Sequence, residues 1–121
     1  NKLQKSLNGS QVLILGVAYK KDIKDIRESP ALDIIQLLIN SGANIDYYDM
    51  FVKSFLLNEI PYNSIKTLTP KMINNYDACV VVTDHSNVDY GLIYENAQLI
   101  IDTRNVFESK NGSHIKRLGQ G

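Results

Sequence analysis

The sequence predicts an α/β domain, namely a Rossmann-like, doubly wound parallel sheet with helices on both faces, in a single domain. Short apolar runs of strand length, such as 12–15 and 78–83, alternate along the chain with helical patterns. The run 78–83 is apolar almost throughout, which is typical of a strand buried on both faces. Ser-Pro at 29–30 and Thr-Pro at 69–70 mark helix starts between such runs. Strands that alternate with helices in this way form parallel, right-handed units.

The first half of the chain predicts a strand–helix–strand unit. The strand over 11–15 leads into a charged loop, and a helix over 31–40 follows with its apolar residues on one face. Gly42 ends this helix, because glycine readily takes the left-handed conformation found after a helix C-terminus. A second strand over 43–48 then closes on Asp49.

The second half predicts shorter elements. They are a short helix over 52–58, a short strand within 60–68, a helix over 70–75, a strand over 78–83, a helix over 90–95 and a last short strand over 99–101. Pro61 interrupts the first of these strands, because proline cannot donate to a ladder. From Asn111 the tail is polar, with Ile115 and Leu118 as candidate anchors.

Length and charge exclude several function classes. The 121 residues suffice for one domain of ordinary size with its own core. Thirteen basic residues balance thirteen acidic ones, so no overall field attracts nucleic acid or an anionic membrane, and we expect neither as a partner. No apolar run approaches the roughly 20 residues of a membrane span, and no signal peptide is visible.

Cysteine usage indicates a reducing compartment. Cys79 is the one cysteine of the sequence, so no disulfide forms within the chain, and we expect a cytoplasmic protein. Cys79 lies in an apolar strand, where burial raises the pKa of a thiol and makes it unreactive. We therefore interpret it as a small buried hydrophobic residue rather than a nucleophile.

Cations are predicted to meet at one edge of the sheet. In a parallel sheet all carboxyl ends share an edge, so Lys20, after the first strand, and Arg104, after the last, converge there. Arg27, just before a helix N-terminus, joins them, and such a set forms a phosphate or pyrophosphate site. The alternative is that these are solvated charges paired with the neighbouring acids Asp22, Asp25 and Glu28.

The dinucleotide-binding fingerprint is absent from this loop. Residues 16–18 read Gly-Val-Ala rather than the start of G-x-G-x-x-G, so the sequence does not predict a self-contained NAD domain. Without those glycines, Asp49 at the end of the second strand is assigned a turn or capping role rather than a ribose contact. His85 is interpreted as a polar rim residue, and no cluster with metal-ligand spacing is visible. Tyr19 lies in the loop, where its ring can stack on a base.

The segment 15–31, LGVAYKKDIKDIRESPA, resembles the signature of the C-terminal, UDP-binding domain of the UDP-glucose/GDP-mannose dehydrogenase family. The resemblance continues at 42–43, 48–49, 81–83 and 101–105 and covers nearly the whole chain. It implies that residues 1–10 are the end of an inter-domain helix or linker and that 11–121 are the UDP-sugar-binding domain. Because the chain begins at Asn1 rather than methionine, we expect a fragment or a trimmed chain.

The family resemblance also implies roles for individual residues. Lys20 and Arg104 match positions that contact the UDP moiety, and Tyr19 stands beside Lys20 where the family often has phenylalanine. Arg27 matches an arginine that reaches the NAD pyrophosphate across a domain interface. The glycine-rich motif of the catalytic cysteine is not in this sequence, and Cys79 does not match it, so we expect no catalytic residue here and no activity from this chain alone.

For the full-length protein, the resemblance implies an NAD-dependent UDP-sugar 6-dehydrogenase. Such enzymes oxidise the sugar C6 hydroxyl to a carboxylate in two steps, through a thiohemiacetal and a thioester on cysteine. The cofactor NAD is bound mainly by an N-terminal domain, and a helical middle domain supports a homo-oligomer; both domains are implied partners. The form of the signature is most similar to the UDP-N-acetylglucosamine or UDP-N-acetylmannosamine branch, which supplies bacterial surface polysaccharides. Two alternatives stay open, a free-standing nucleotide-binding or dimerisation module and an unrelated flavodoxin-like or receiver-like domain.

Overall fold

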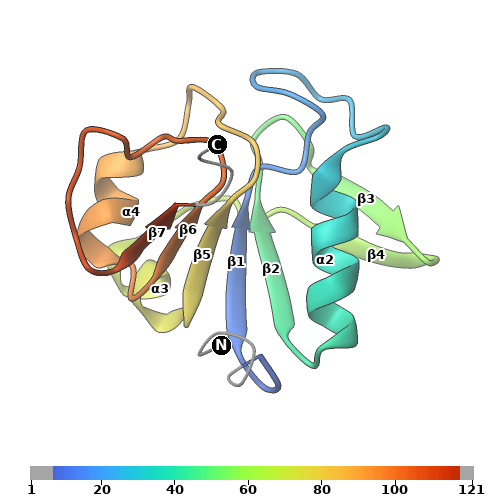
Figure 1. Ribbon diagram of the computed structural model, residues 1–121. Coiled ribbons are helices and arrows are strands. Elements are labelled where there is room, and N and C mark those ends of the chain that lie inside the picture. Colours follow the sequence, from blue (N-terminus) through green and yellow to red (C-terminus); the bar gives the residue numbers. More distant parts are fainter. Residues whose placement is uncertain (1–6, 118–121) are drawn as a thin grey trace.

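A five-stranded parallel sheet forms the centre of the computed structural model, which describes residues 7–117 (Figure 1). Its strand order is β2-β1-β5-β6-β7, and every neighbouring pair is parallel. The strands are β1 (Gln11–Leu15), β2 (Asn44–Tyr48), β5 (Ala78–Val81), β6 (Ile100–Asp102) and β7 (Ile115–Arg117). The predicted α/β fold with a doubly wound parallel sheet is confirmed.

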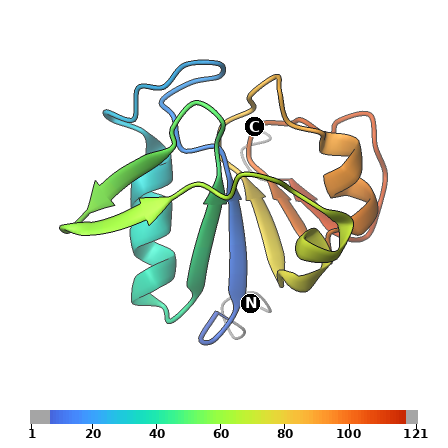
Figure 2. The ribbon, with the colours of Figure 1, turned by 180° about the vertical axis from the view of Figure 1, so that it is seen from behind.

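Helices cover both faces of the sheet. They are α2 (Pro30–Asn40), α3 (Pro70–Asn75) and α4 (Tyr90–Asn96). Figures 1 and 2 show α2 on one face and α3 with α4 on the other. Ser29 and Thr69 cap two of the N-termini as the sequence predicts, and Asp89 caps the third; each side-chain oxygen accepts a backbone N–H group. The predicted helices over 31–40, 70–75 and 90–95 are thus confirmed.

Strand β1 contributes to two hydrophobic cores because its side chains alternate between the faces of the sheet. Val12 and Ile14 lie in the core under α2, and Leu13 and Leu15 lie in the core under α3 and α4. All four are at most 1% exposed. Because β1 is a central strand buried on both faces, it fixes the positions of the ends of the neighbouring strands. The loops that follow those ends therefore start from fixed positions.

The predicted helix over 52–58 is wrong, because this segment belongs to an antiparallel hairpin. The hairpin joins β3 (Ser54–Leu57) to β4 (Ile60–Asn63) and lies beside β2, beyond the edge of the sheet. Asn58 and Glu59 both have positive φ, at +53° and +68°, as in a two-residue type I′ turn. Phe55 packs on aromatic rings of both β2 and β4, so tertiary packing favours the strand over the helix.

The sheet ends on a strand that the sequence does not reveal. Strand β7 follows β6, so the last strand is not the one at 99–101. Only Ile115 of its three residues is buried, which leaves no pattern long enough to detect. The predicted anchor role of Ile115 is confirmed by its place in the core, whereas Leu118 and residues 1–6 of the predicted helix end or linker over 1–10 lie outside the described residues. Among the helices of residues 7–117, none has the length and apolar character that crossing a membrane requires.

Candidate functional site

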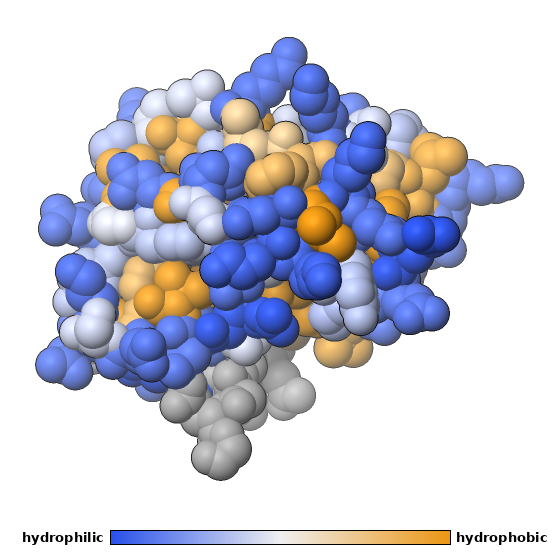
Figure 3. All heavy atoms as spheres, turned by 90° about the horizontal axis from the view of Figure 1, so that it is seen from above, coloured by the Kyte–Doolittle hydropathy of each residue, from blue (hydrophilic) through white to orange (hydrophobic). Residues whose placement is uncertain are grey.

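The carboxyl ends of the strands meet the loops that carry the predicted site residues. The strand order, apart from the hairpin, follows the 2-1-3-4-5 pattern of flavodoxin-like domains, in which ligands bind outside the carboxyl ends where the order reverses. That point lies between β1 and β5, where the loops 16–29 and 82–89 begin. Figure 3 shows this edge from above, with polar and apolar side chains interleaved over it.

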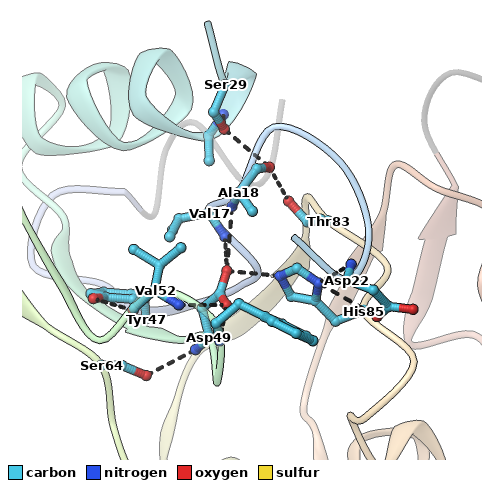
Figure 4. Close-up of polar contacts among 12 residues, drawn as sticks. Val17, Ala18, Asp22, Ser29, Tyr47, Asp49, Val52, Ser64, Thr83 and His85 are labelled. Atoms are coloured by element: carbon cyan, nitrogen blue, oxygen red, sulfur yellow. Dashed lines mark hydrogen bonds and ion pairs between the residues drawn. The ribbon is translucent and has the colours of Figure 1, made fainter. Parts of the chain in front are cut away.

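Asp49, at the end of β2, is the centre of a buried hydrogen-bond network (Figure 4). Its side chain is 0% exposed. Five donors reach its carboxylate at 2.8 to 3.3 Å, namely the backbone N–H groups of Val17, Ala18, Phe51 and Val52 and the Nε2–H of His85. Burial alone raises the pKa of Asp49, but the hydrogen bonds outweigh burial and hold that pKa below its usual value. The predicted turn or capping role is confirmed, and no oxygen is left for a ribose.

His85 is wholly buried, so it lies at the predicted edge without being an exposed rim residue. Its Nδ1 accepts the backbone N–H of Asp22 at 2.7 Å, and its Nε2 lies 2.9 Å from the Asp49 carboxylate. An acceptor at Nδ1 and a carboxylate beside Nε2 together define the neutral tautomer with its hydrogen on Nε2. The ring of Phe51 packs on the imidazole with centroids 4.7 Å apart.

The loop after β1 is fastened to the loop after β5 at two places. Near its start, the hydroxyl of Thr83 donates to the carbonyl of Ala18 at 2.7 Å. Further along, the carboxylate of Asp22 accepts both the backbone N–H and the hydroxyl of Ser86, at 2.7 and 2.6 Å. These bonds lower the pKa of Asp22. Gly16 permits the close approach, because its φ is +87° and a Cβ there would lie 2.5 Å from Thr83.

A second buried carboxylate shapes the loop that carries Arg104. Asp102, the last residue of β6, is 0% exposed. It accepts the backbone N–H groups of Arg104, Val106 and Phe107 at 2.8 to 3.1 Å. The backbone at Arg104 is therefore fixed, while its side chain extends from the edge of the sheet.

The side chain of Arg104 is only loosely paired. Its Nε lies 3.7 Å from Oδ1 of Asp84, which is beyond hydrogen-bond distance. The Arg104 side chain is 44% exposed, and that Asp84 oxygen is buried with no hydrogen-bond partner within the described part of the chain. This contact places Arg104 against the loop after β5, next to the segment that binds Asp22.

The structure brings the predicted cations to one edge but not into mutual contact. Lys20 is exposed and has no hydrogen bond or ion pair with any of residues 7–117, and Tyr19 beside it is 52% exposed. Arg27 instead forms a bidentate pair with Asp25, with its Nε at 3.0 Å and a terminal nitrogen at 2.8 Å from the two oxygens. The alternative of locally paired charges thus holds for Arg27 and not for Lys20.

Two other features do not supply the expected chemistry. Helix α2 offers no free N–H group over its first three positions, because Pro30 has none and the amides of Ala31 and Leu32 bond to Ser29. An anion here must therefore be held by side chains rather than by the helix N-terminus. The predicted burial of Cys79 is confirmed, since it is 0% exposed and desolvation raises its pKa to about 12.

An open parallel sheet with exposed cations over its carboxyl edge is suited to an anionic ligand, and its first loop lacks the glycine fingerprint of dinucleotide-binding domains. A comparison with family profiles identifies it further. The profile described as the UDP-glucose/GDP-mannose dehydrogenase family, UDP binding domain, matches residues 13–109. The chain belongs to this family, as the signature segment predicts. The family match, rather than the strand order, rules out an unrelated flavodoxin-like or receiver-like domain.

Curated relatives agree with this assignment. UDP-N-acetyl-D-mannosamine dehydrogenase of Methanococcus aeolicus is 32% identical over 123 residues, covering 92% of this chain and 26% of that protein. UDP-glucose 6-dehydrogenase TuaD of Bacillus subtilis is 32% identical over 111 residues, covering 84% of this chain and 23% of that protein. The chain thus spans about a quarter of the length of the curated relatives it matches.

Solved structures give the same result. The UDP-D-ManNAc dehydrogenase of Pyrococcus horikoshii superposes with a TM-score of 0.74 at 27% identity, covering 98% of this chain and 28% of that one. The NDP-N-acetyl-D-galactosaminuronic acid dehydrogenase of Methanosarcina mazei Go1 has a TM-score of 0.70 at 30% identity, covering 98% and 26%. Both structures are described as dehydrogenases, and this chain corresponds to about a quarter of each.

Sequence reasoning missed the buried network that organises the edge. Asp49 directly follows β2 and Asp102 is the last residue of β6, and an aspartate at the carboxyl end of a strand was a usable signal for a loop-organising carboxylate. His85 carries no such signal, because a single histidine in a sequence does not reveal burial. Its role is visible only once β1, β2 and β5 are placed side by side.

Proposed function

We propose that this domain holds the UDP part of a nucleotide sugar for an NAD-dependent UDP-sugar dehydrogenase. The observation that carries the proposal is that two cations, Lys20 and Arg104, lack a close partner at the carboxyl edge of the sheet, where open α/β sheets bind ligands. Charge-assisted hydrogen bonds to phosphate oxygens are among the strongest that a side chain makes. An unpaired lysine and a loosely paired arginine are therefore suited to a diphosphate.

Tyr19 and Arg27 are assigned supporting roles in the proposal. The Tyr19 ring is 52% exposed beside Lys20, which suits stacking on the uracil or packing against the ribose. The Arg27 side chain is 86% exposed, and its pair with Asp25 is a surface pair of little energetic weight. It is free to exchange Asp25 for a pyrophosphate presented by another domain, as an NAD contact requires.

For the whole protein, we propose oxidation of the sugar C6 hydroxyl to a carboxylate with NAD as acceptor. The catalytic cysteine and the main NAD site belong to the domains that this chain does not include, so the chain supplies binding and orientation only. Relatives described as UDP-N-acetyl-D-mannosamine dehydrogenases support an N-acetylated hexosamine as the sugar. The TuaD relative keeps UDP-glucose as the competing substrate. A role in surface polysaccharide synthesis, homo-oligomer formation and a cytoplasmic location remain predictions of the same proposal.

The test is a titration of UDP into the 121-residue chain, followed by amide shifts in NMR spectra. We expect saturable binding, weak because the other domains are absent, with shifts at the loops 16–29 and 103–107. Lys20→Ala and Arg104→Ala should each weaken binding roughly tenfold or more, as the loss of a charged hydrogen bond does.

Lys71→Ala is the matched control, because Lys71 is an exposed lysine on α3, outside the loops of this edge. It should leave UDP affinity within about twofold of the wild type, as expected for a surface change remote from the ligand. Equal affinity in the wild type and both site variants would remove these cations from the site.

A further inference from the structure

The loop that presents Lys20 is held in shape by hydrogen bonds to residues of the loop after β5. Two residues after Lys20, Asp22 bonds to the loop after β5 through both its backbone and its side chain. Its φ is +61°, a left-handed conformation that disfavours residues other than glycine and that needs outside contacts to persist. The shape of the loop at Lys20 therefore depends on the partners of Asp22.

The partner of the Asp22 backbone is a buried histidine. His85 Nδ1 accepts the Asp22 N–H at 2.7 Å, and its Nε2 lies 2.9 Å from Asp49. Asp49 in turn binds the amides of Val17 and Ala18 at the start of the same loop. The imidazole thus connects the ends of β1, β2 and β5 at the point where the strand order reverses (Figure 4).

We propose that Asp22, His85 and Ser86, here called the Asp22–His85 clamp, set the affinity of the nucleotide site by fixing the shape of the loop that carries Tyr19 and Lys20. His85 is 0% exposed, so a ligand bound at the surface of the edge has no access to it, and it is a positioning residue and not a catalytic one. The clamp rests on the proposed function, because it acts through Lys20. With the clamp intact, the nucleotide meets a preformed loop, whereas without it the nucleotide must order the loop at the expense of affinity.

The two bonds of His85 can be separated by two conservative variants. In His85→Asn, the amide oxygen replaces Nδ1 and still accepts the Asp22 N–H, but the contact with Asp49 is lost. In His85→Gln, the longer side chain still donates to Asp49, but the Asp22 N–H loses its acceptor. We expect UDP affinity within about threefold of the wild type for His85→Asn and roughly tenfold weaker for His85→Gln, since a partly buried donor left without its acceptor is costly.

Ile93→Val is the control for general destabilisation. Ile93 is a buried residue of α4, in the core on the other face of the sheet from α2. The variant should lower the melting temperature without changing UDP affinity. A purely structural role of His85 predicts that the Asn and Gln variants, if equally destabilised, bind UDP equally well.

A second pair of variants tests the clamp at its exposed end, where folding is not at risk. Asp22 has a side chain 40% exposed. Asp22→Asn keeps an oxygen for the Ser86 N–H and tolerates a positive φ, whereas Asp22→Ala keeps neither advantage. We expect Asp22→Ala to weaken UDP binding roughly five- to tenfold and Asp22→Asn to remain within about threefold of the wild type.

Hydrogen exchange at the Asp22 amide, measured without ligand, tests the effect of the clamp on loop shape separately from its effect on UDP affinity. The clamp predicts faster exchange in His85→Gln than in His85→Asn or the wild type. If no UDP binding is seen in the wild type, the proposed function is wrong. The exchange pattern alone then tests whether the clamp controls the shape of the loop. The proposal is overturned if the wild type binds UDP and His85→Gln and Asp22→Ala bind it equally tightly, or if exchange at Asp22 is the same in both His85 variants.

Discussion

Two carboxylates at the carboxyl edge of the sheet have opposite surroundings. Asp49, after β2, is 1% exposed and receives five hydrogen bonds. Asp84, after β5, has a side chain 27% exposed, one buried oxygen without a hydrogen-bond partner among the described residues, and an arginine nitrogen 3.7 Å away. The first carboxylate is fully satisfied within the protein, and the second is not.

This difference separates the structural part of the edge from the part that is available to a ligand. A buried carboxylate with all its donors in place holds the surrounding backbone and has no capacity for a new partner. A loose pair at the rim leaves the guanidinium of Arg104 able to bond elsewhere. We therefore expect Asp49 to contribute to stability, and Arg104 and Lys20 to nucleotide affinity.

The largest effect is expected from Asp49→Ala. This change leaves buried backbone N–H groups and the His85 ring without an acceptor, which should lower the free energy of unfolding by about 3–5 kcal/mol. Urea denaturation followed by circular dichroism measures it. Asp33→Ala, at an exposed position in the first turn of α2, is the control and should cost at most about 1 kcal/mol. Similar losses for the two variants would contradict the structural role of Asp49.

Acid should weaken the same network. Because the pKa of Asp49 is held below its usual value, its stabilising contribution is complete above the unfolded-state pKa of about 3.9. That contribution is lost as the pH falls through the lower folded-state pKa, with a slope of up to about 1.4 kcal/mol per pH unit for one proton. Asp49→Asn should be less stable at pH 7 but show a shallower slope in acid. Its residual slope reflects other carboxyl groups, such as Asp22, whose pKa is lowered by its bonds to Ser86. Parallel slopes for wild type and variant would show that Asp49 does not titrate with unfolding.

A smaller effect, on affinity, is expected from Asp84→Asn. Asp84→Asn removes a negative charge about 4 Å from Arg104. In a solvated site this makes the electrostatic interaction with a bound anion more favourable by about 1 kcal/mol at most. UDP binding should tighten by up to roughly fivefold, more at low salt than at high salt. Titration at two ionic strengths measures both effects. Weaker binding would mean that Asp84 holds Arg104 in place, contrary to the loose pairing described above.

The smallest effect is expected from Arg27→Ala. The Arg27–Asp25 pair lies at the surface, with the arginine side chain 86% exposed, and such pairs contribute little to folding. The midpoint urea concentration should not change measurably. A clear loss of stability would show that this pair organises the loop, and the comparison between buried and rim charges would need revision.

Local signals predicted those elements that are stabilised locally. Ser29 and Pro30 mark the start of α2 because capping and proline geometry act within a few residues. The hairpin at 54–63 was not predictable in this way, because its strands are stabilised by aromatic packing on β2 and by a turn of two non-glycine residues. Strand β7 was not predicted for a similar reason, because it is defined by its pairing with β6 rather than by a sequence pattern of its own.

In the candidate site, too, some features were predictable from the sequence and others depend on tertiary structure. The positions of Lys20 and Arg104 followed from one rule, that carboxyl ends of parallel strands share an edge, and the structure places both residues in loops at that edge. The network of Asp49, His85 and Asp22 did not follow, because it is assembled from three strand ends that are distant in sequence. The availability of the cations is likewise a tertiary property, as the pairing of Arg27 with Asp25 illustrates.

The most direct test of the central claim compares UDP with uridine on the wild-type chain by amide chemical shifts. If the rim cations bind the diphosphate, UDP should shift the amides around Lys20 and Arg104, and uridine at the same concentration should leave them nearly unmoved. Amides bonded to Asp49 should keep their shifts with either ligand. Equal responses to UDP and uridine at Lys20 and Arg104, or no response there at millimolar UDP, would contradict the account.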